Sequence, residues 1–295
     1  MATSMNAPPK IARLYEDVPK DSLDRLVAFR ERYPYQTISL GGRQWRFIDS
    51  GEGEKALFVP AGATTIAEVS FNSLEHFAKQ YRVIAPDYPP IEELQELFDG
   101  FIDLLDYLGV NQFCTMGGSY GGWMVQSLVR QYPERISKLV VTAVGPPSSE
   151  NSQEIARLMV WFRITPTFIL RWMINRSFSR MESNKADDHD MALLWALVRE
   201  AVYFHLGRAD ILALMQRLID QTENYSFSAD DLKDWSGRIL LVFGSEDPAT
   251  PLEKREAMVE LYPQAEVNVF EGGEHGIAIT HQQEYFAVID EFLAS

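Results

Sequence analysis

The chain has 295 residues, of which 46% are hydrophobic and 23% are charged, as in an ordinary globular protein. Its 27 basic and 42 acidic residues give a formal net charge of −15 at pH 7, which argues against nucleic acid and anionic membranes as partners. The single cysteine, Cys114, excludes an internal disulfide bond. The length accommodates one large α/β domain with an insertion, or two smaller domains.

The first part of the chain, up to about Tyr35, has a polar and partly helical pattern, and we expect an N-terminal arm. Its start lacks the apolar stretch of a signal peptide, so we expect a cytoplasmic protein. Two strand-like runs follow at 37–40 and 44–48. Gly41 and Gly42 between them predict a hairpin.

Strand-like and helix-like segments then alternate along the chain. Apolar runs at 56–59, 82–86 and 138–143 read as strands, and residues 91–108 have helical spacing. Such alternation predicts an α/β fold in which helices cover both faces of a mostly parallel sheet.

The segment around Ser119 carries the clearest functional signal. The sequence GGSYG at 117–121 follows an apolar run at 112–116 and opens a helix-like run at 123–128. A Gly-x-Ser-x-Gly sequence between a strand and a helix is typical of a nucleophile elbow, which exposes a serine hydroxyl at the top of a sheet. The glycines permit the close backbone approach that this turn needs. An ordinary glycine-rich turn is the plainer alternative.

A serine hydroxyl needs a base, and the base needs an acid to orient it. Behind an elbow these follow in the order acid, then histidine. His275 is the one histidine of five in a glycine-rich loop after a strand-like run, and Asp247 follows the apolar run 238–243. We therefore predict Ser119, Asp247 and His275 as the catalytic residues, with Glu246 as the alternative acid. A solvated loop histidine and a turn-forming aspartate remain the plainer interpretation.

Residues 145–234 interrupt the alternation with helical patterns only. We predict a helical cap here, inserted into an α/β core formed by 36–144 and 235–295, with the arm at 1–35. The apolar stretch 158–170 contains charge and proline, so it is not expected to insert across a membrane. Its large side chains pack the cap onto the core, or also line a pocket for the substrate. The expected substrate-binding residues are Trp161, Phe162, Phe168 and Trp172.

The sequence predicts neither a metal ion nor a cofactor. The polar stretch Asp187, Asp188, His189 and Asp190 has no glycine to shape a metal-binding loop, and adjacent residues do not all face one ion. A solvated turn before a helix is expected instead.

From about Gln36 to the C-terminus, the chain resembles the α/β-hydrolase fold superfamily. The resemblance is carried by the elbow, by Gly244 with Asp247, and by His275 with Gly276. A closer likeness is to the maspardin-type branch of that superfamily. It is carried by the stretches at 81–85, 98–101 and 261–263, and by the loop at 60–65.

The resemblance implies an oxyanion hole built from two backbone N–H groups. Tyr120, directly after the nucleophile, supplies one, and Ala63 is the candidate for the other. The loop before Ala63 reads Pro60-Ala61-Gly62, where the family often has His-Gly. It also lacks the His-Gly-Gly-Pro of proline iminopeptidases, which disfavours a peptidase.

Serine rather than aspartate at the elbow implies acyl chemistry, unlike the dehalogenases and epoxide hydrolases of this superfamily. We expect a serine hydrolase that acts on a small-molecule carboxylic ester or related acyl compound through an acyl-enzyme. A non-catalytic protein-interaction module, as the maspardin-type branch implies, is the main alternative. Acyl transfer, perhydrolysis and carbon–carbon bond hydrolysis by the same residues also stay open.

Overall fold

The computed structural model describes residues 9–51, 53–147, 152–179 and 189–295. Its centre is an eight-stranded sheet with the strand order β1-β2-β4-β3-β5-β6-β7-β8. β1 pairs antiparallel with β2, and β2 with β4, whereas all other neighbours are parallel. The strands are β1 (Gln36–Leu40), β2 (Arg43–Asp49), β3 (Ala56–Phe58), β4 (Arg82–Pro86), β5 (Phe113–Gly118), β6 (Ile136–Thr142), β7 (Arg238–Gly244) and β8 (Glu266–Phe270). The predicted hairpin and the mostly parallel sheet are confirmed.

Helices cover both faces of the sheet, because alternate residues of its central strands point to opposite sides. Leu241 and Phe243 of β7 belong to one core cluster, and Leu240 and Val242 belong to another. The first cluster lies under α5 (Leu94–Tyr107), α6 (Tyr120–Gln131) and α11 (Leu252–Leu261). The second lies under α3 (Lys20–Arg32), η2 (Ala67–Ser70), α4 (Phe71–Phe77), α12 (Ile277–Thr280) and α13 (Gln282–Ala294). The α/β fold class is confirmed.

The described N-terminal residues take part in this packing. They form α2 (Pro9–Ala12), η1 (Arg13–Tyr15) and α3. Leu26 and Phe29 of α3 are buried, and the Phe29 ring meets that of Phe71 edge to face at 5.4 Å. The polar pattern of α3 therefore describes only its outer face.

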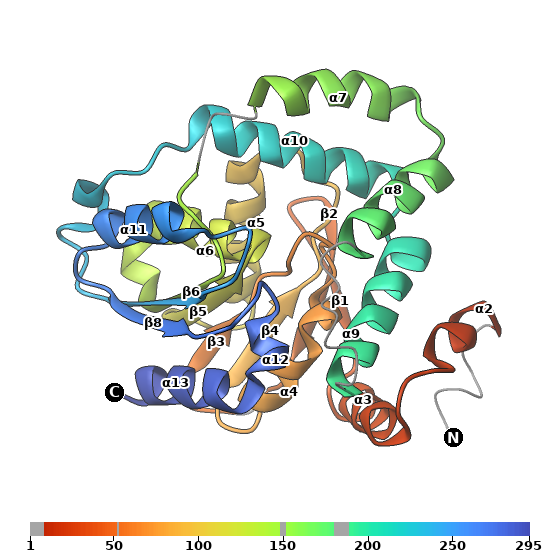
Figure 1. Cartoon of the computed structure of the whole chain (residues 1–295), viewed down its shortest axis with the longest axis horizontal. Helices are drawn as coiled ribbons and strands as arrows, with labels where there is room; N and C mark the ends of the chain where they lie inside the picture. The colour runs from red at the N-terminus through yellow and green to blue at the C-terminus, as the bar shows by residue number, and fades with distance from the viewer. Residues whose placement is uncertain (1–8, 52, 148–151, 180–188) are drawn as a thin grey trace.

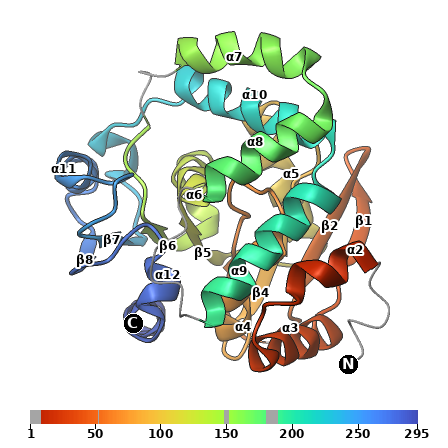
Figure 2. The same cartoon turned by 45° about the vertical axis from the view of Figure 1, so that its right-hand side comes forward.

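Between β6 and β7 the described residues form helices and no strand. These inserted helices are α7 (Ser152–Ile164), α8 (Thr167–Ser179), α9 (His189–Glu200), the π-helical turn η4 (Ala201–His205), α10 (Arg208–Asn224) and η5 (Ala229–Leu232). Figures 1 and 2 show α7 lying along α10 and α9 beside α3. The division into cap and core stays a prediction.

Part-buried ion pairs of Arg30 join the N-terminal helix α3 to η2 and to α9. Arg30 of α3 contacts Glu68 at 2.5 Å and Glu200 at 3.1 Å, and the hydroxyl of Tyr15 donates a hydrogen bond to Glu200. Burial on its own raises the pKa of Glu200, but hydrogen bonding to His205, the charge of Arg30 and the bond from Tyr15 outweigh it and lower that pKa to about 2. The carboxylate of Glu200 is therefore stabilised by folding.

Replacing Glu200 by glutamine should lower the free energy of unfolding by up to about 3 kcal/mol at pH 7, since one pKa unit is worth about 1.4 kcal/mol. Because the folded-state pKa lies below the unfolded one, the wild-type advantage is complete above about pH 4.5 and shrinks as the pH falls towards 2. Urea unfolding at a series of pH values measures it. Glu266→Gln, which breaks an exposed pair with Arg238, is the control and should cost under about 1 kcal/mol. Equal losses in both variants would contradict the buried network.

Candidate active site

Ser119 occupies a strained turn between a strand and a helix. β5 ends at Gly118, α6 begins at Tyr120, and Ser119 between them has φ 52° and ψ −123°. A positive φ is rare for a residue with a side chain and is held here by the surroundings. The backbone N–H of Ser119 donates to the carbonyl of Thr142 on the neighbouring strand β6, at 3.0 Å. This is the strand–turn–helix setting that the sequence predicts for a nucleophile elbow.

Asp247 and His275 are hydrogen-bonded to each other on the loops after β7 and β8. Nδ1 of His275 lies 2.9 Å from Oδ2 of Asp247. The carboxylate also accepts from the backbone N–H of Ala249 and the hydroxyl of Thr250, each at 2.8 Å. The alternative acid, Glu246, is exposed, so the structure brings Asp247 and not its neighbour to the imidazole.

The environment keeps Asp247 ionised. Burial raises the pKa of this carboxyl, but the hydrogen bond and charge of His275, together with the bonds from Thr250 and Ala249, outweigh burial and hold its pKa below the ordinary value. An ionised carboxylate only accepts hydrogen bonds, so a neutral imidazole at His275 carries its proton on Nδ1 and offers Nε2 as an acceptor. In this state the imidazole is able to act as a base.

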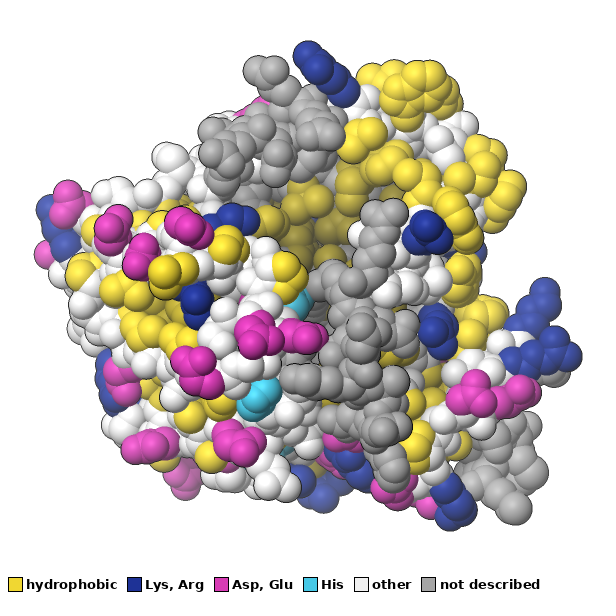
Figure 3. Space-filling model, viewed as in Figure 1, with side chains coloured by type: hydrophobic (Ala, Val, Ile, Leu, Met, Phe, Trp, Pro, Cys, Tyr) yellow, Lys and Arg dark blue, Asp and Glu magenta, His cyan; other side chains and the backbone are white. Residues whose placement is uncertain are grey.

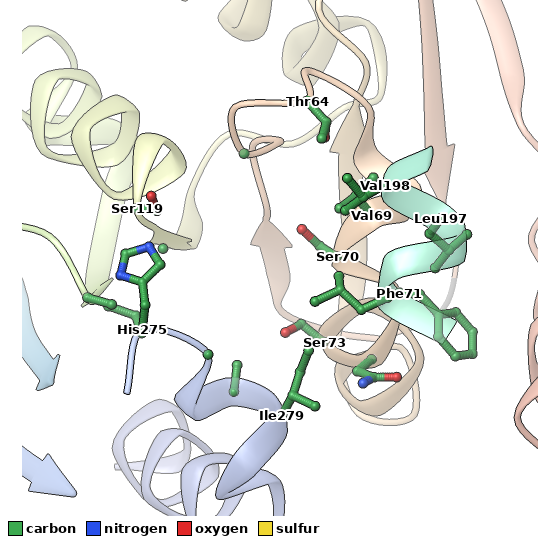
Figure 4. Close-up of a pocket in the computed structure, with 18 of the residues that line it drawn as sticks. Thr64, Val69, Ser70, Phe71, Ser73, Ser119, Leu197, Val198, His275 and Ile279 are labelled. Carbon is green, nitrogen blue, oxygen red and sulfur yellow. The ribbon is translucent and has the colours of Figure 1, made fainter. Parts of the chain in front are cut away.

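Ser119 and His275 line the same cavity, which has a volume of about 280 Å³. Figure 4 shows the imidazole of His275 beside the hydroxyl of Ser119 at one side of this cavity, and Phe71, Leu197 and Val198 at the opposite side. Asp247 is 2% exposed and lies behind His275. The structure therefore brings the three predicted catalytic residues to one edge of the sheet.

The walls of the cavity are mainly apolar. α9 supplies Met191, Leu194 and Val198 among others, and α8 supplies Phe178. Besides Ser119 and His275, the polar side chains that line the cavity are hydroxyl and amide groups: Thr64, Ser70, Asn72, Ser73, Thr142 and Tyr285. No lysine or arginine is among the described residues that line the cavity. The described walls thus offer a ligand apolar contacts and a few neutral hydrogen-bonding groups.

The four residues predicted to bind substrate lie elsewhere. Trp161, Phe168 and Trp172 are 65%, 72% and 56% exposed, and Phe162 packs beside a small cluster of the inserted helices. None of them lines the cavity around Ser119. The reason is that α7 lies along α10, while α9 approaches the cavity. The apolar run at 191–198 was the signal for this wall, and the prediction missed it.

The candidate oxyanion loop passes close to the first turn of α6. A Cβ atom on Gly121 would lie 3.2 Å from the carbonyl oxygen of Pro60 and 3.4 Å from that of Ala61. The hydroxyl of Tyr88 donates to the carbonyl of Ala61 at 2.7 Å, which fixes the loop just before Ala63. Ala63 itself lines the cavity.

Tyr120 provides a second fixed point of this region. It is the first residue of α6, where backbone N–H groups have no acceptor within the helix. Its side chain is buried, and its hydroxyl accepts a hydrogen bond from Nε of Arg217 at 3.0 Å. Arg217, in α10, is 1% exposed. An inserted helix thus holds the residue that follows Ser119, a contact that the sequence did not signal.

The described residues contain no group of three or more His, Cys, Asp or Glu residues placed to hold a metal ion. None of their helices combines the length and the apolar character that a membrane crossing needs. Asp187 and Asp188 of the acidic stretch lie outside the described residues.

Comparisons with known proteins identify the family of this fold. A family model described as the alpha/beta hydrolase fold matches residues 55–282. The 2-hydroxymuconate semialdehyde hydrolase of Pseudomonas putida is 26% identical over 281 residues, which cover 87% of this chain and 93% of that protein. Maspardin of Danio rerio is 28% identical over 249 residues, which cover 80% of this chain and 75% of maspardin. The predicted resemblance to maspardin is confirmed. The resemblance to 2-hydroxymuconate semialdehyde hydrolase is of similar strength.

Solved structures show the same fold. A hydrolase from Pseudomonas aeruginosa superposes with a TM-score of 0.72 at 16% identity, over 89% of this chain and 99% of its own. A meta-cleavage product hydrolase from Pseudomonas fluorescens superposes with a TM-score of 0.64 at 20% identity, over 88% and 97%. With the family model spanning most of the sheet, these findings lead to one conclusion: the chain belongs to the α/β-hydrolase fold family.

Proposed function

We propose that this protein is a serine hydrolase that cleaves a small, neutral carboxylic ester or a related acyl compound. The observation that carries the proposal is the hydrogen-bonded pair of Asp247 and His275 at the same cavity as Ser119, whose backbone is held at a positive φ. A histidine oriented by a buried acid beside a serine in a strained turn is the arrangement that activates a hydroxyl. In this proposal the inserted helices act as the cap.

The proposed reaction has two halves. Oγ of Ser119 attacks the carbonyl carbon, and its proton passes to Nε2 of His275 while Nδ1–H stays bonded to Asp247. The backbone N–H groups of Tyr120 and Ala63 are the proposed donors to the oxyanion. Collapse of the tetrahedral intermediate expels the alcohol, which takes the proton from Nε2. Water then attacks the acyl-enzyme and gives a proton to Nε2 of His275. The bond between Oγ of Ser119 and the acyl carbon breaks, Oγ takes that proton, and the carboxylic acid leaves.

The cavity also suggests the kind of substrate. Its volume of about 280 Å³ is at the lower end of ordinary ligand sites, which favours a short acyl chain. The apolar walls and the absence of lysine and arginine among the described lining residues favour an uncharged compound. We expect kcat/KM for p-nitrophenyl esters to peak at short chains and to fall as the chain lengthens.

Labelling with a fluorophosphonate tests the proposal directly. We expect one equivalent of probe on Ser119, located by mass spectrometry, and loss of labelling in His275→Ala, because the hydroxyl then has no base. His76→Ala is a matched control, since His76 pairs with Asp290 and is not among the residues lining this cavity. A folded protein that takes no label and turns over no ester of the panel would refute the hydrolase.

Carbon–carbon bond hydrolysis is the second candidate, favoured by the similarity to 2-hydroxymuconate semialdehyde hydrolase. The substrate in that name carries a carboxylate, for which the described walls of this cavity offer no cationic side chain. Turnover of 2-hydroxymuconate semialdehyde that exceeds turnover of every neutral ester would favour this reaction over ester cleavage. A non-catalytic interaction module, favoured by the similarity to maspardin, predicts no turnover of either compound.

A further inference from the structure

The outer surfaces of α7 and α8 carry an unusual concentration of exposed apolar side chains. Of the thirteen large hydrophobic residues that are exposed in the described part of the chain, seven lie on these two helices. We call them the α7–α8 apolar face: Leu158, Val160, Trp161, Ile164, Phe168, Trp172 and Met173. Figure 3 shows them gathered over one corner of the molecule. A patch of this kind on a monomer indicates a contact surface.

This face is separate from the cavity and from the core. None of its residues lines the cavity around Ser119. The inner sides of the same helices are already buried, as Met159 and Leu170 are only 5% and 1% exposed. α7 contacts α10, and α8 contacts η4. The helices are thus packed on one side, and their other side would be polar in a protein that meets only water.

The segment is also positively charged, in contrast to the rest of the chain. Residues 157–179 contain four arginines and no acidic residue, although the whole chain has a net charge of −15. Arg157, Arg163 and Arg176 are exposed, and the guanidinium of Arg176 lies 5.8 Å from the centre of the Trp172 ring. The whole-chain charge, which argues against anionic membranes, conceals this local reversal.

The turn between the two helices is fixed. The guanidinium of Arg208, at the start of α10, donates to the carbonyl oxygens of Thr165 at 2.6 Å and Phe162 at 3.1 Å. On either side of this turn, Ile164 and Phe168 are 69% and 72% exposed, so they project outward. The apolar side chains are therefore presented on a rigid, protruding surface.

We propose that the α7–α8 apolar face docks on the surface of an anionic lipid membrane. Projecting Trp, Phe and Ile side chains beside arginines, on helices that lie along a surface, are the features of interfacial membrane binding. Each arginine near an anionic leaflet adds to the electrostatic attraction. A second copy of the chain fits less well, because the same face of the partner would bring three exposed arginines against three. The proposal does not depend on the hydrolase activity.

Flotation of the full-length protein with vesicles tests the proposal. We expect binding to vesicles of phosphatidylcholine with 30% phosphatidylglycerol, and binding weaker by about tenfold or more to phosphatidylcholine alone or at 0.5 M salt. Replacing Trp161, Phe168 and Trp172 together by serine should lower binding to the anionic vesicles by at least about tenfold. It should also abolish the blue shift of tryptophan emission that the vesicles cause. Arg163→Gln with Arg176→Gln should weaken binding without removing it.

The matched control is the triple replacement of Leu252, Val259 and Val269 by serine. These residues are 56%, 42% and 42% exposed but lie on α11 and β8. Their replacement by serine should leave vesicle binding unchanged. Absence of binding by the folded wild type, or equal binding by wild type and the Trp161–Phe168–Trp172 variant, would overturn the proposal. The proposal would also be overturned if the wild type is a dimer by light scattering, the variant is a monomer, and neither protein binds vesicles. Circular dichroism establishes that each variant is folded.

Discussion

Replacing Ser119 by alanine should lower kcat for a short p-nitrophenyl ester by at least about a thousandfold and leave KM within a few-fold. The hydroxyl oxygen of Ser119 is the proposed nucleophile that bonds to the carbonyl carbon of the ester. The apolar walls proposed to bind the ester stay in place in the variant. Residual turnover would come from the oxyanion donors and from binding. Stopped-flow and steady-state assays measure both constants. The variant should also lose the burst of p-nitrophenol that marks an acyl-enzyme.

Two other serines supply matched controls for this change. Ser70 and Ser73 line the same cavity, so Ser70→Ala and Ser73→Ala remove a hydroxyl of the same kind from the same space. Their kcat should stay within about tenfold of the wild type. The double variant of Ser119→Ala with His275→Ala should be no slower than Ser119→Ala alone, because the two residues act as one unit. Additive losses, or equal losses in all three serine variants, would remove Ser119 from its proposed role.

The arrangement of the candidate site could be predicted where it depends on short local patterns. The elbow at Ser119 needs glycines at fixed positions and a strand and a helix on either side, and all of these are neighbours in the chain. Asp247 and His275 could be singled out because each lies in the loop after a parallel strand, and these loops meet at one edge of the sheet. The pairing of these two residues across 28 positions therefore followed from topology.

The substrate wall could not be found in the same way. α7 and α8 are apolar on two sides, so their pattern does not reveal which side faces inward. The most conspicuous aromatic residues, Trp161, Phe168 and Trp172, were assigned to the pocket because large apolar side chains are usually buried. In the structure they form the exposed face, and the less conspicuous α9 lines the cavity.

Long-range polar contacts were also beyond the sequence. Arg30 and Glu200 are 170 positions apart, and nothing local marks either as the partner of the other. Arg217 reads as one more exposed charge on an amphipathic helix, yet it is buried and donates to Tyr120. Such contacts depend on how the inserted helices settle on the sheet, and each helix by itself permits several placements.

Replacing Gly117 by alanine should lower the free energy of unfolding by about 3 kcal/mol or more, a large share of the roughly 5–15 kcal/mol that stabilises a typical domain. A Cβ atom at this position would lie 2.5 Å from the carbonyl carbon of Gly121 and 2.9 Å from the amide nitrogen of Gly122. Both are backbone atoms of the first turn of α6, so no side chain is able to move aside.

Gly118→Ala is the matched control. Its Cβ would meet Thr142 at 3.6 Å or more, an ordinary contact, and should cost no more than about 1 kcal/mol. Neither glycine has a positive φ, so the comparison isolates the packing of β5 against α6. Urea unfolding of the two variants decides the matter. A Gly117→Ala protein as stable as Gly118→Ala would mean that strand and helix separate without loss. The strained turn assigned to Ser119 would then be wrong.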